Sequence, residues 1–280
     1  MTPIPVPAEL SPVERSALLP ILGRARDAGA KEPILGDEWA RTVVASLAVD
    51  WDALGLPRKE SFSVAVRGRL IDDACRAFLA DHPDGAVLDL GCGLDDRAQR
   101  VSPPQGSAWF DLDLPGVLAL RRRLRMRTPV DADYREVAAD ATTDGWLAEL
   151  PDDRPLAVLA DGFFPFLPAA AARRLVQRLI DRVPGGELVM NGYTTLARSL
   201  MPRVKAIRDL GVDTAAGTAF DDPHEPERWH PRLRLAQRTM LSASPYAARM
   251  PWALRAGVRL MNAVPRLADR SDLGVLRYTF

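Results

Sequence analysis

A short apolar run that ends in a glycine turn, followed by a second apolar run that ends in acids, constrains this chain most. Residues 87–90 read Val-Leu-Asp-Leu and lead into Gly91-Cys92-Gly93. The second run ends in Asp111-Leu112-Asp113. A strand, a glycine turn and an acid at the end of the next strand are the parts of an α/β unit that binds nucleosides. The pattern predicts a small-molecule cofactor, and therefore an enzyme.

Short apolar runs alternate with helical segments from residue 86 onward. We expect strands at 86–90, 108–112, 135–139, 156–160 and 187–191, and helices at 95–101, 115–125, 145–149, 169–183 and 196–209. This alternation predicts an α/β fold, with a mostly parallel sheet and helices on both faces. Two more strands are expected within 232–242 and 274–280, with a helix at 252–263 between them.

The residues before the sheet are predicted to be helical. Ser11-Pro12-Val13-Glu14 has the features of a helix start, with a serine cap, proline at the first position and an acid in the first turn. We expect helices at 11–27, 37–49 and 61–79. Residues 1–60 would form an N-terminal helical cap on a domain of residues 61–280, and the two would make one structural unit.

Balanced charge and few cysteines limit the function classes. Lys+Arg and Asp+Glu both number 37, which argues against nucleic acid or an anionic membrane as a partner. Two cysteines make no disulfide framework, the N-terminus lacks the pattern of a secretory signal, and no apolar stretch is long enough to span a membrane. These features predict a cytoplasmic protein. We interpret Arg121–Arg127 as a solvated helix face, with an RNA site as the alternative.

The glycine turn departs from the Gly-x-Gly-x-x-Gly pattern of dinucleotide-binding proteins, because Asp96 takes the place of the third glycine. Two carboxylates, Asp95 and Asp96, would repel a pyrophosphate, which disfavours a nicotinamide-dependent reductase. S-adenosylmethionine has no phosphate and carries a positive sulfonium, so it fits better. A plain tight turn in a domain that binds nothing is the alternative.

Several further motifs follow one another at a characteristic spacing between residues 12 and 195. They are Arg67-Gly68-Arg69-Leu70-Ile71-Asp72, Leu90-Gly91-Cys92-Gly93-Leu94-Asp95-Asp96-Arg97, Asp111-Leu112-Asp113-Leu114-Pro115-Gly116-Val117, Ala139-Asp140-Ala141-Thr142 and Ala160-Asp161-Gly162. The set resembles the leucine carboxyl methyltransferase superfamily, and within it the bacterial, tetracenomycin-type O-methyltransferases of polyketide biosynthesis. The resemblance implies a class I, Rossmann-like methyltransferase fold, S-adenosylmethionine as cofactor and S-adenosylhomocysteine as product.

The resemblance also implies residue roles. Arg67 would pair with the carboxylate of the methionine moiety, although it could instead be a solvated helix arginine. Gly91 would let the backbone approach the cofactor, with Cys92 beside it as a small packing residue. Asp113 would accept hydrogen bonds from the ribose hydroxyls, and Asp111 is interpreted as a structural neighbour.

Two further acids are assigned in the same way. Asp140, with the backbone of Ala141, would recognise the adenine; the alternative is that Asp140 caps the following segment. Asp161 would meet the methionine ammonium, although the family usually has glutamate at this position. Asp96 and Phe163–Phe166 are further departures from the family pattern. They motivate a second hypothesis, a vestigial protein that binds the cofactor without methyl transfer.

The acceptor is expected to be a small molecule with a carboxylate or phenol. The motifs contain no well-placed base, which favours a carboxylate because it is already ionised at neutral pH. His224 and His230 are the candidate bases for a phenol, and their spacing fits no standard metal site, so no metal is expected. Phe163, Tyr193 and Trp229 are candidate pocket walls. We expect a monomer or homodimer.

Overall fold

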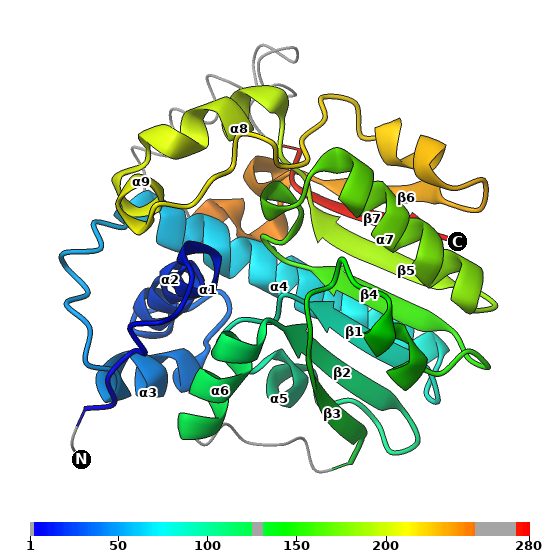
Figure 1. Cartoon of the computed structure of the whole chain (residues 1–280), viewed down its shortest axis with the longest axis horizontal. Coiled ribbons are helices and arrows are strands. Elements are labelled where there is room, and N and C mark those ends of the chain that lie inside the picture. The colour runs from blue at the N-terminus through cyan, green and yellow to red at the C-terminus, as the bar shows by residue number, and fades with distance from the viewer. Residues whose placement is uncertain (1–2, 125–130, 250–272) are drawn as a thin grey trace.

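A seven-stranded sheet forms the centre of the computed structural model, which describes residues 3–124, 131–249 and 273–280, apart from the side chains of residues 58 and 59 (Figure 1). The strand order is β3-β2-β1-β4-β5-β7-β6. The strands are β1 (Ala86–Leu90), β2 (Ala108–Asp113), β3 (Asp133–Ala138), β4 (Leu156–Ala160), β5 (Gly186–Asn191), β6 (Arg234–Thr239) and β7 (Val275–Thr279). β1 to β5 run parallel, and β7 pairs antiparallel with both β5 and β6. The predicted α/β class and all seven strands are confirmed.

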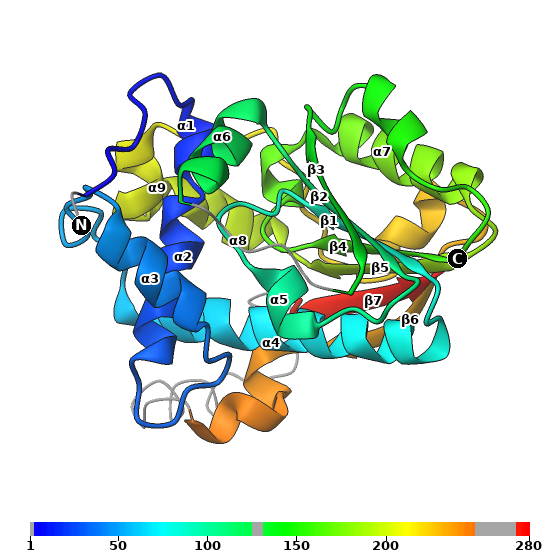
Figure 2. The same cartoon turned by 90° about the horizontal axis from the view of Figure 1, so that it is seen from below.

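Helices cover both faces of the sheet. They are α1 (Pro12–Arg15), α2 (Leu18–Ala28), α3 (Glu38–Ser46), α4 (Arg58–Asp81), α5 (Arg97–Val101), α6 (Pro115–Arg123), α7 (Ala169–Arg182), α8 (Thr195–Leu200) and α9 (Lys205–Leu210). Figure 2 shows α4 and α7 on opposite faces. Successive residues of β1 point to opposite faces of the sheet. Val87 packs in the core on the α4 side, and Leu88 packs in the core on the α7 side.

Prolines divide two of the expected helices. The helix expected at 11–27 is split into α1 and α2, which places Pro20 in the first turn of α2, where its missing N–H is not needed. The helix expected at 196–209 is split into α8 and α9 around Pro202, which lies in a short 3₁₀ turn. Residues 145–149 form a 3₁₀ helix, and the helix expected at 252–263 lies outside the described residues.

The N-terminal helices pack against the edge of the α/β unit. Leu18 and Ile21 of α2 share a core with Leu94, from the glycine-turn segment, and Leu120 of α6. The expected boundary between residues 60 and 61 falls inside α4, which begins at Arg58. Among the described helices, none is both long and apolar enough to cross a membrane.

Candidate functional site

A cavity of about 830 Å³ opens at the carboxyl ends of β1, β2 and β4. In an open parallel sheet this edge is the usual place for a ligand, and the volume lies within the roughly 300–1,000 Å³ of small-molecule sites. Nine of the residues predicted from the sequence line it: Arg67, Gly91, Cys92, Asp113, Asp140, Ala141, Asp161, Phe163 and Tyr193. Segments far apart in the chain therefore meet here.

The glycine turn forms the floor of the cavity. Gly91 adopts a left-handed φ of 65°, and its N–H donates to the Leu112 carbonyl at 2.8 Å. A Cβ on Gly91 would lie 2.8 Å from Cδ2 of Phe163. Any other residue would therefore be strained in its backbone and would displace the Phe163 ring from the cavity wall.

Asp113 ends β2 beside this turn. Its Oδ2 accepts a hydrogen bond from the Gly93 N–H at 2.7 Å, and its Oδ1 accepts one from the Leu114 N–H at 2.7 Å. Burial raises the pKa of Asp113 to about 6, and the two backbone donors oppose the rise. A carboxylate has about four acceptor sites. Each oxygen of Asp113 can thus accept one more hydrogen bond, which suits a pair of vicinal hydroxyls.

Arg67 and Asp161 form a buried ion pair at the opposite side of the glycine turn. Arg67 Nε donates to Asp161 Oδ1, and Asp161 Oδ2 lies 3.4 Å from Arg24 Nη2 and 3.5 Å from Arg97 Nη2. Although burial opposes ionisation, these arginines hold the pKa of Asp161 below its usual range. A cation and an anion that both line the cavity match the carboxylate and ammonium of an amino acid. Together with Asp113, these residues fit S-adenosylmethionine.

The Arg67–Asp161 pair belongs to a larger buried cluster. Asp95 contacts Arg24 at 2.9 Å, Arg97 at 3.1 Å and Arg100 at 2.5 Å. These arginines hold the pKa of Asp95 well below its usual range despite its burial. The cluster comprises Arg24, Arg67, Arg97, Arg100, Asp37, Asp72, Asp89, Asp95 and Asp161. Three cations compensate the charge of Asp95, so Asp95 would repel a phosphate less strongly than the sequence predicts.

Arg121 corrects the interpretation of the basic run as a solvated face. It is fully buried and donates to the carbonyl oxygens of Gly93, at 2.9 Å, and Asp95, at 2.7 Å. It also pairs with Asp111, which confirms Asp111 as a structural acid. These two hydrogen bonds from Arg121 to carbonyl oxygens therefore hold the backbone of the glycine turn in place. Arg122 of the same run is exposed, and residues 125–127 lie outside the described part of the chain.

Asp140 is exposed and organises its own turn. Its Oδ1 accepts hydrogen bonds from the backbone N–H and the hydroxyl of Thr142, both at 2.8 Å. This bonding closes a local turn and is not the helix cap considered as the alternative, because the 3₁₀ helix at 145–149 has Asp144 at its N-cap. Asp140, Ala141 and Thr142 all line the cavity, so the turn also presents backbone groups to a ligand.

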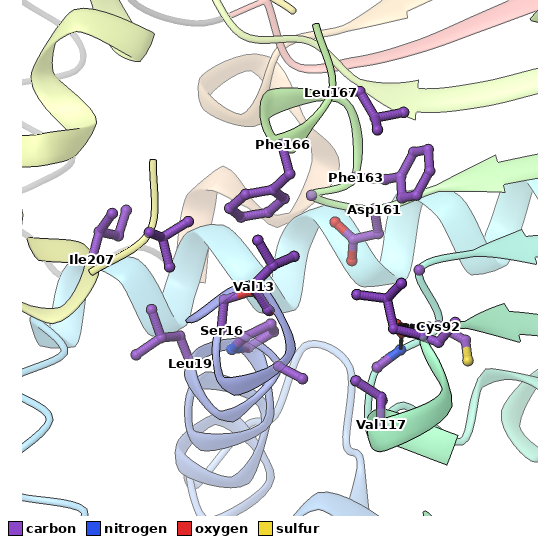
Figure 3. Close-up of a pocket in the computed structure, with 18 of the residues that line it drawn as sticks. Val13, Ser16, Leu19, Cys92, Val117, Asp161, Phe163, Phe166, Leu167 and Ile207 are labelled. Atoms are coloured by element: carbon purple, nitrogen blue, oxygen red, sulfur yellow. Dashed lines mark hydrogen bonds between the residues drawn. The ribbon is translucent and has the colours of Figure 1, made fainter. Parts of the chain in front are cut away.

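Part of the cavity wall is apolar. Among the described residues, three large apolar side chains are exposed, and all three line this cavity: Val13 at 39%, Leu196 at 46% and Leu200 at 40%. Figure 3 shows Val13, Leu19, Phe166 and Ile207 among the side chains that line the cavity, with Asp161 and Cys92 toward the right of the view. An exposed apolar patch of this kind marks a binding site for an apolar partner.

Three predicted residues lie elsewhere among the described residues. His224 is 62% exposed and pairs with Glu227, and Nε2 of His230 contacts Asp181 at 3.0 Å. Trp229 is buried against Phe164 and Phe220 in the core. None of the three lines the cavity, because they belong to a 3₁₀ segment that packs on α7. No group of three or more potential metal ligands occurs among the described residues.

Known proteins are similar to this chain over the segments that form the cavity. Residues 17–180 match the leucine carboxyl methyltransferase family. The chain belongs to this family. The tetracenomycin polyketide synthesis O-methyltransferase TcmP of Streptomyces glaucescens is 32% identical over 97% of this chain and 98% of its own length. The S-adenosyl-L-methionine-dependent methyltransferase dpfgK of Gibberella zeae is 30% identical over 95% and 92%.

A solved structure supports the fold. A DUF574 family protein from Streptomyces avermitilis aligns with a TM-score of 0.54 at 20% identity, over 94% of this chain and 95% of that one. As a member of the leucine carboxyl methyltransferase family, the protein is an S-adenosylmethionine-dependent methyltransferase. The resemblance inferred from its motifs is thereby confirmed.

Proposed function

We propose that this methyltransferase methylates the carboxylate of an apolar small molecule, as an O-methyltransferase of polyketide-like metabolites. One observation carries the choice of acceptor group: among the side chains that the structure describes, no histidine or lysine lines the cavity. A phenol has a pKa of about 10 and is helped by a base, whereas a carboxylate, with a pKa of about 4, is ionised at neutral pH. The name of TcmP, with its polyketide substrate class, is consistent with this choice.

The chain's own residues bind and align the reactants. Arg67 would hold the carboxylate and Asp161 the ammonium of the amino-acid end, while Asp113 would accept from the ribose hydroxyls. The turn from Asp140 to Thr142 would border the adenine, and Gly91 and Cys92 would give their backbone to the same ligand. When bound, S-adenosylmethionine would supply the methyl group from its sulfonium to the acceptor oxygen, and the electron pair of the broken carbon–sulfur bond would remain on sulfur.

Alignment and exclusion of water are the contributions left to the protein. Phe163, over the glycine turn, and Tyr193 would shape the space between the two reactants. The apolar side chains Val13, Leu196 and Leu200 would be covered by the acceptor, which removes them and the reacting oxygen from water. Holding two reactants in line can contribute roughly 7–11 kcal/mol to lowering a barrier.

The proposal is tested by methylation assays with matched acceptors. Purified protein and S-adenosylmethionine are incubated with 2-naphthoic acid and, separately, with 2-naphthol, and products are identified by mass spectrometry. We expect the methyl ester from the acid, at a rate nearly independent of pH between 7 and 9, since the acceptor stays ionised. Methylation of the naphthol alone would refute the carboxylate assignment. Binding of S-adenosylhomocysteine without methylation of any acid or phenol would favour the vestigial hypothesis.

A further inference from the structure

Glu60 is an acid in the apolar part of the cavity that none of the sequence motifs include. It lies in the first turn of α4, seven residues before Arg67, and both residues line the cavity together with Val64. The spacing 60, 64 and 67 places all three on one face of the helix. A rise of 1.5 Å per residue separates Glu60 from Arg67 by about 10 Å along the helix axis.

The half-buried Glu60 carboxylate has no direct partner among the described residues, although the charge of Arg67 on the same helix face attracts it. The cavity lining nearby in the chain and on the facing segment is apolar, with Leu56, Val64, Leu200 and Val204. Lys205 of α9 approaches this region, but its ammonium donates to the Ala53 carbonyl at 3.2 Å and to Asp209 at 2.6 Å. Within the described part of the chain, no group donates a hydrogen bond to the Glu60 carboxylate and no cation lies within ion-pair distance of it.

An unpaired carboxylate in an apolar compartment favours a ligand that brings its own hydrogen-bond donor, since hydrogen bonds to charged groups are the stronger ones. It also repels a second carboxylate. Arg24 and Arg67 also line the cavity, but both pair with Asp161, and Arg67 would hold the cofactor. A hydroxy acid would therefore lie with its hydroxyl toward Glu60 and its carboxylate turned away from Glu60.

We propose that Glu60 is a specificity-determining residue that accepts a hydrogen bond from a hydroxyl at the far end of the acceptor. This inference rests on the proposed function. It narrows the substrate class to apolar hydroxy acids whose hydroxyl and methylated carboxylate lie at opposite ends of the molecule. Fused aromatic rings with substituents at opposite ends have this shape.

The experiment measures acceptor binding by calorimetry in the presence of saturating S-adenosylhomocysteine, so that no turnover occurs. The probes are 6-hydroxy-2-naphthoic acid and 2-naphthoic acid, which differ by one hydroxyl. We expect the native protein to bind the hydroxy acid about tenfold more tightly, and Glu60→Leu to lose this preference. Glu60→Gln keeps a neutral acceptor oxygen and should keep part of the preference.

A matched control separates recognition from helix stabilisation. An acid in the first turn also stabilises the positive end of a helix, and Glu38 occupies the first turn of α3 and pairs only with the exposed Arg41 among the described residues. Glu38→Leu should leave the preference intact, and S-adenosylhomocysteine affinity should be unchanged in every variant. A preference that survives in Glu60→Leu, or is absent from the native protein, would overturn the inference. In a separate incubation with S-adenosylmethionine, a methyl ether as the product of 6-hydroxy-2-naphthoic acid would overturn the proposed function as well.

Discussion

Removal of the Arg67 guanidinium should weaken binding of a cofactor that has an amino-acid end, and only of such a cofactor. Arg67 lines the cavity and now pairs with Asp161. A charge-assisted hydrogen bond contributes roughly 1.5–3 kcal/mol, so Arg67→Met is expected to weaken S-adenosylhomocysteine binding by about 10- to 100-fold. Asp161 keeps Arg24 and Arg97 at 3.4 and 3.5 Å, so it stays ionised and the fold is retained.

Isothermal titration calorimetry with two ligands isolates the effect. 5′-Methylthioadenosine shares the adenosine and the sulfur with S-adenosylhomocysteine but lacks the amino-acid end. Its affinity should be nearly unchanged in Arg67→Met. Arg69, two residues on, is 40% exposed and pairs with Asp73 on the outside of α4, so Arg69→Met serves as the control and should alter neither affinity. Equal losses for the two ligands, or no loss for either, would refute the assignment of Arg67.

Other variants test the remaining contacts. Asp113→Ala should weaken S-adenosylhomocysteine binding by roughly 10- to 100-fold in calorimetry, because the acceptors for the ribose hydroxyls are lost; unchanged affinity would discredit that role. The pKa of Asp96 is raised to about 7, mainly by burial, so its ionisation disfavours the fold as pH rises from about 4 to 7. In urea unfolding, the stability advantage of Asp96→Asn over the native protein should therefore grow by about 2 kcal/mol between pH 5 and 8, and a shrinking advantage would contradict this. The Gly116 N–H donates to Glu14 at 3.0 Å, and a Cβ on Gly116 would collide with Glu14 and Leu10. Gly116→Ala should thus lose about 1–3 kcal/mol in thermal unfolding, and an unaltered midpoint would show that the N-terminal segment adjusts freely.

The parts of the site that could be predicted from the sequence depend on local patterns. β4 is a continuous apolar run, and β1 is one apart from Asp89; glycine, proline or acids bound both runs, a pattern typical of buried parallel strands. The acid at the end of β2 and the glycines after β1 follow from the same pattern. These features fix the floor of the cavity, and there the prediction and the structure agree.

The buried arginine cluster could not be predicted in this way. Arg97 meets Asp72, Asp89 and Asp161, which are separated from it by up to 64 residues, so no local spacing reveals the pairing. The sequence does carry a signal that Arg121 is buried. Arg121 lies three and four residues after Leu118 and Val117, on the buried face of α6, and a charged residue on an apolar face calls for a buried partner.

The place of β7 between β5 and β6 has a consequence for biosynthesis. β6 is synthesised before β7 but pairs only with β7 in the sheet. β6 therefore has no partner strand until residues 275–279 have left the ribosome. Every residue assigned to cofactor recognition precedes Asn191, the last residue of β5. The nascent chain should thus acquire affinity for its cofactor before β6 and β7 complete the sheet. The bound cofactor would then stabilise the partly synthesised domain.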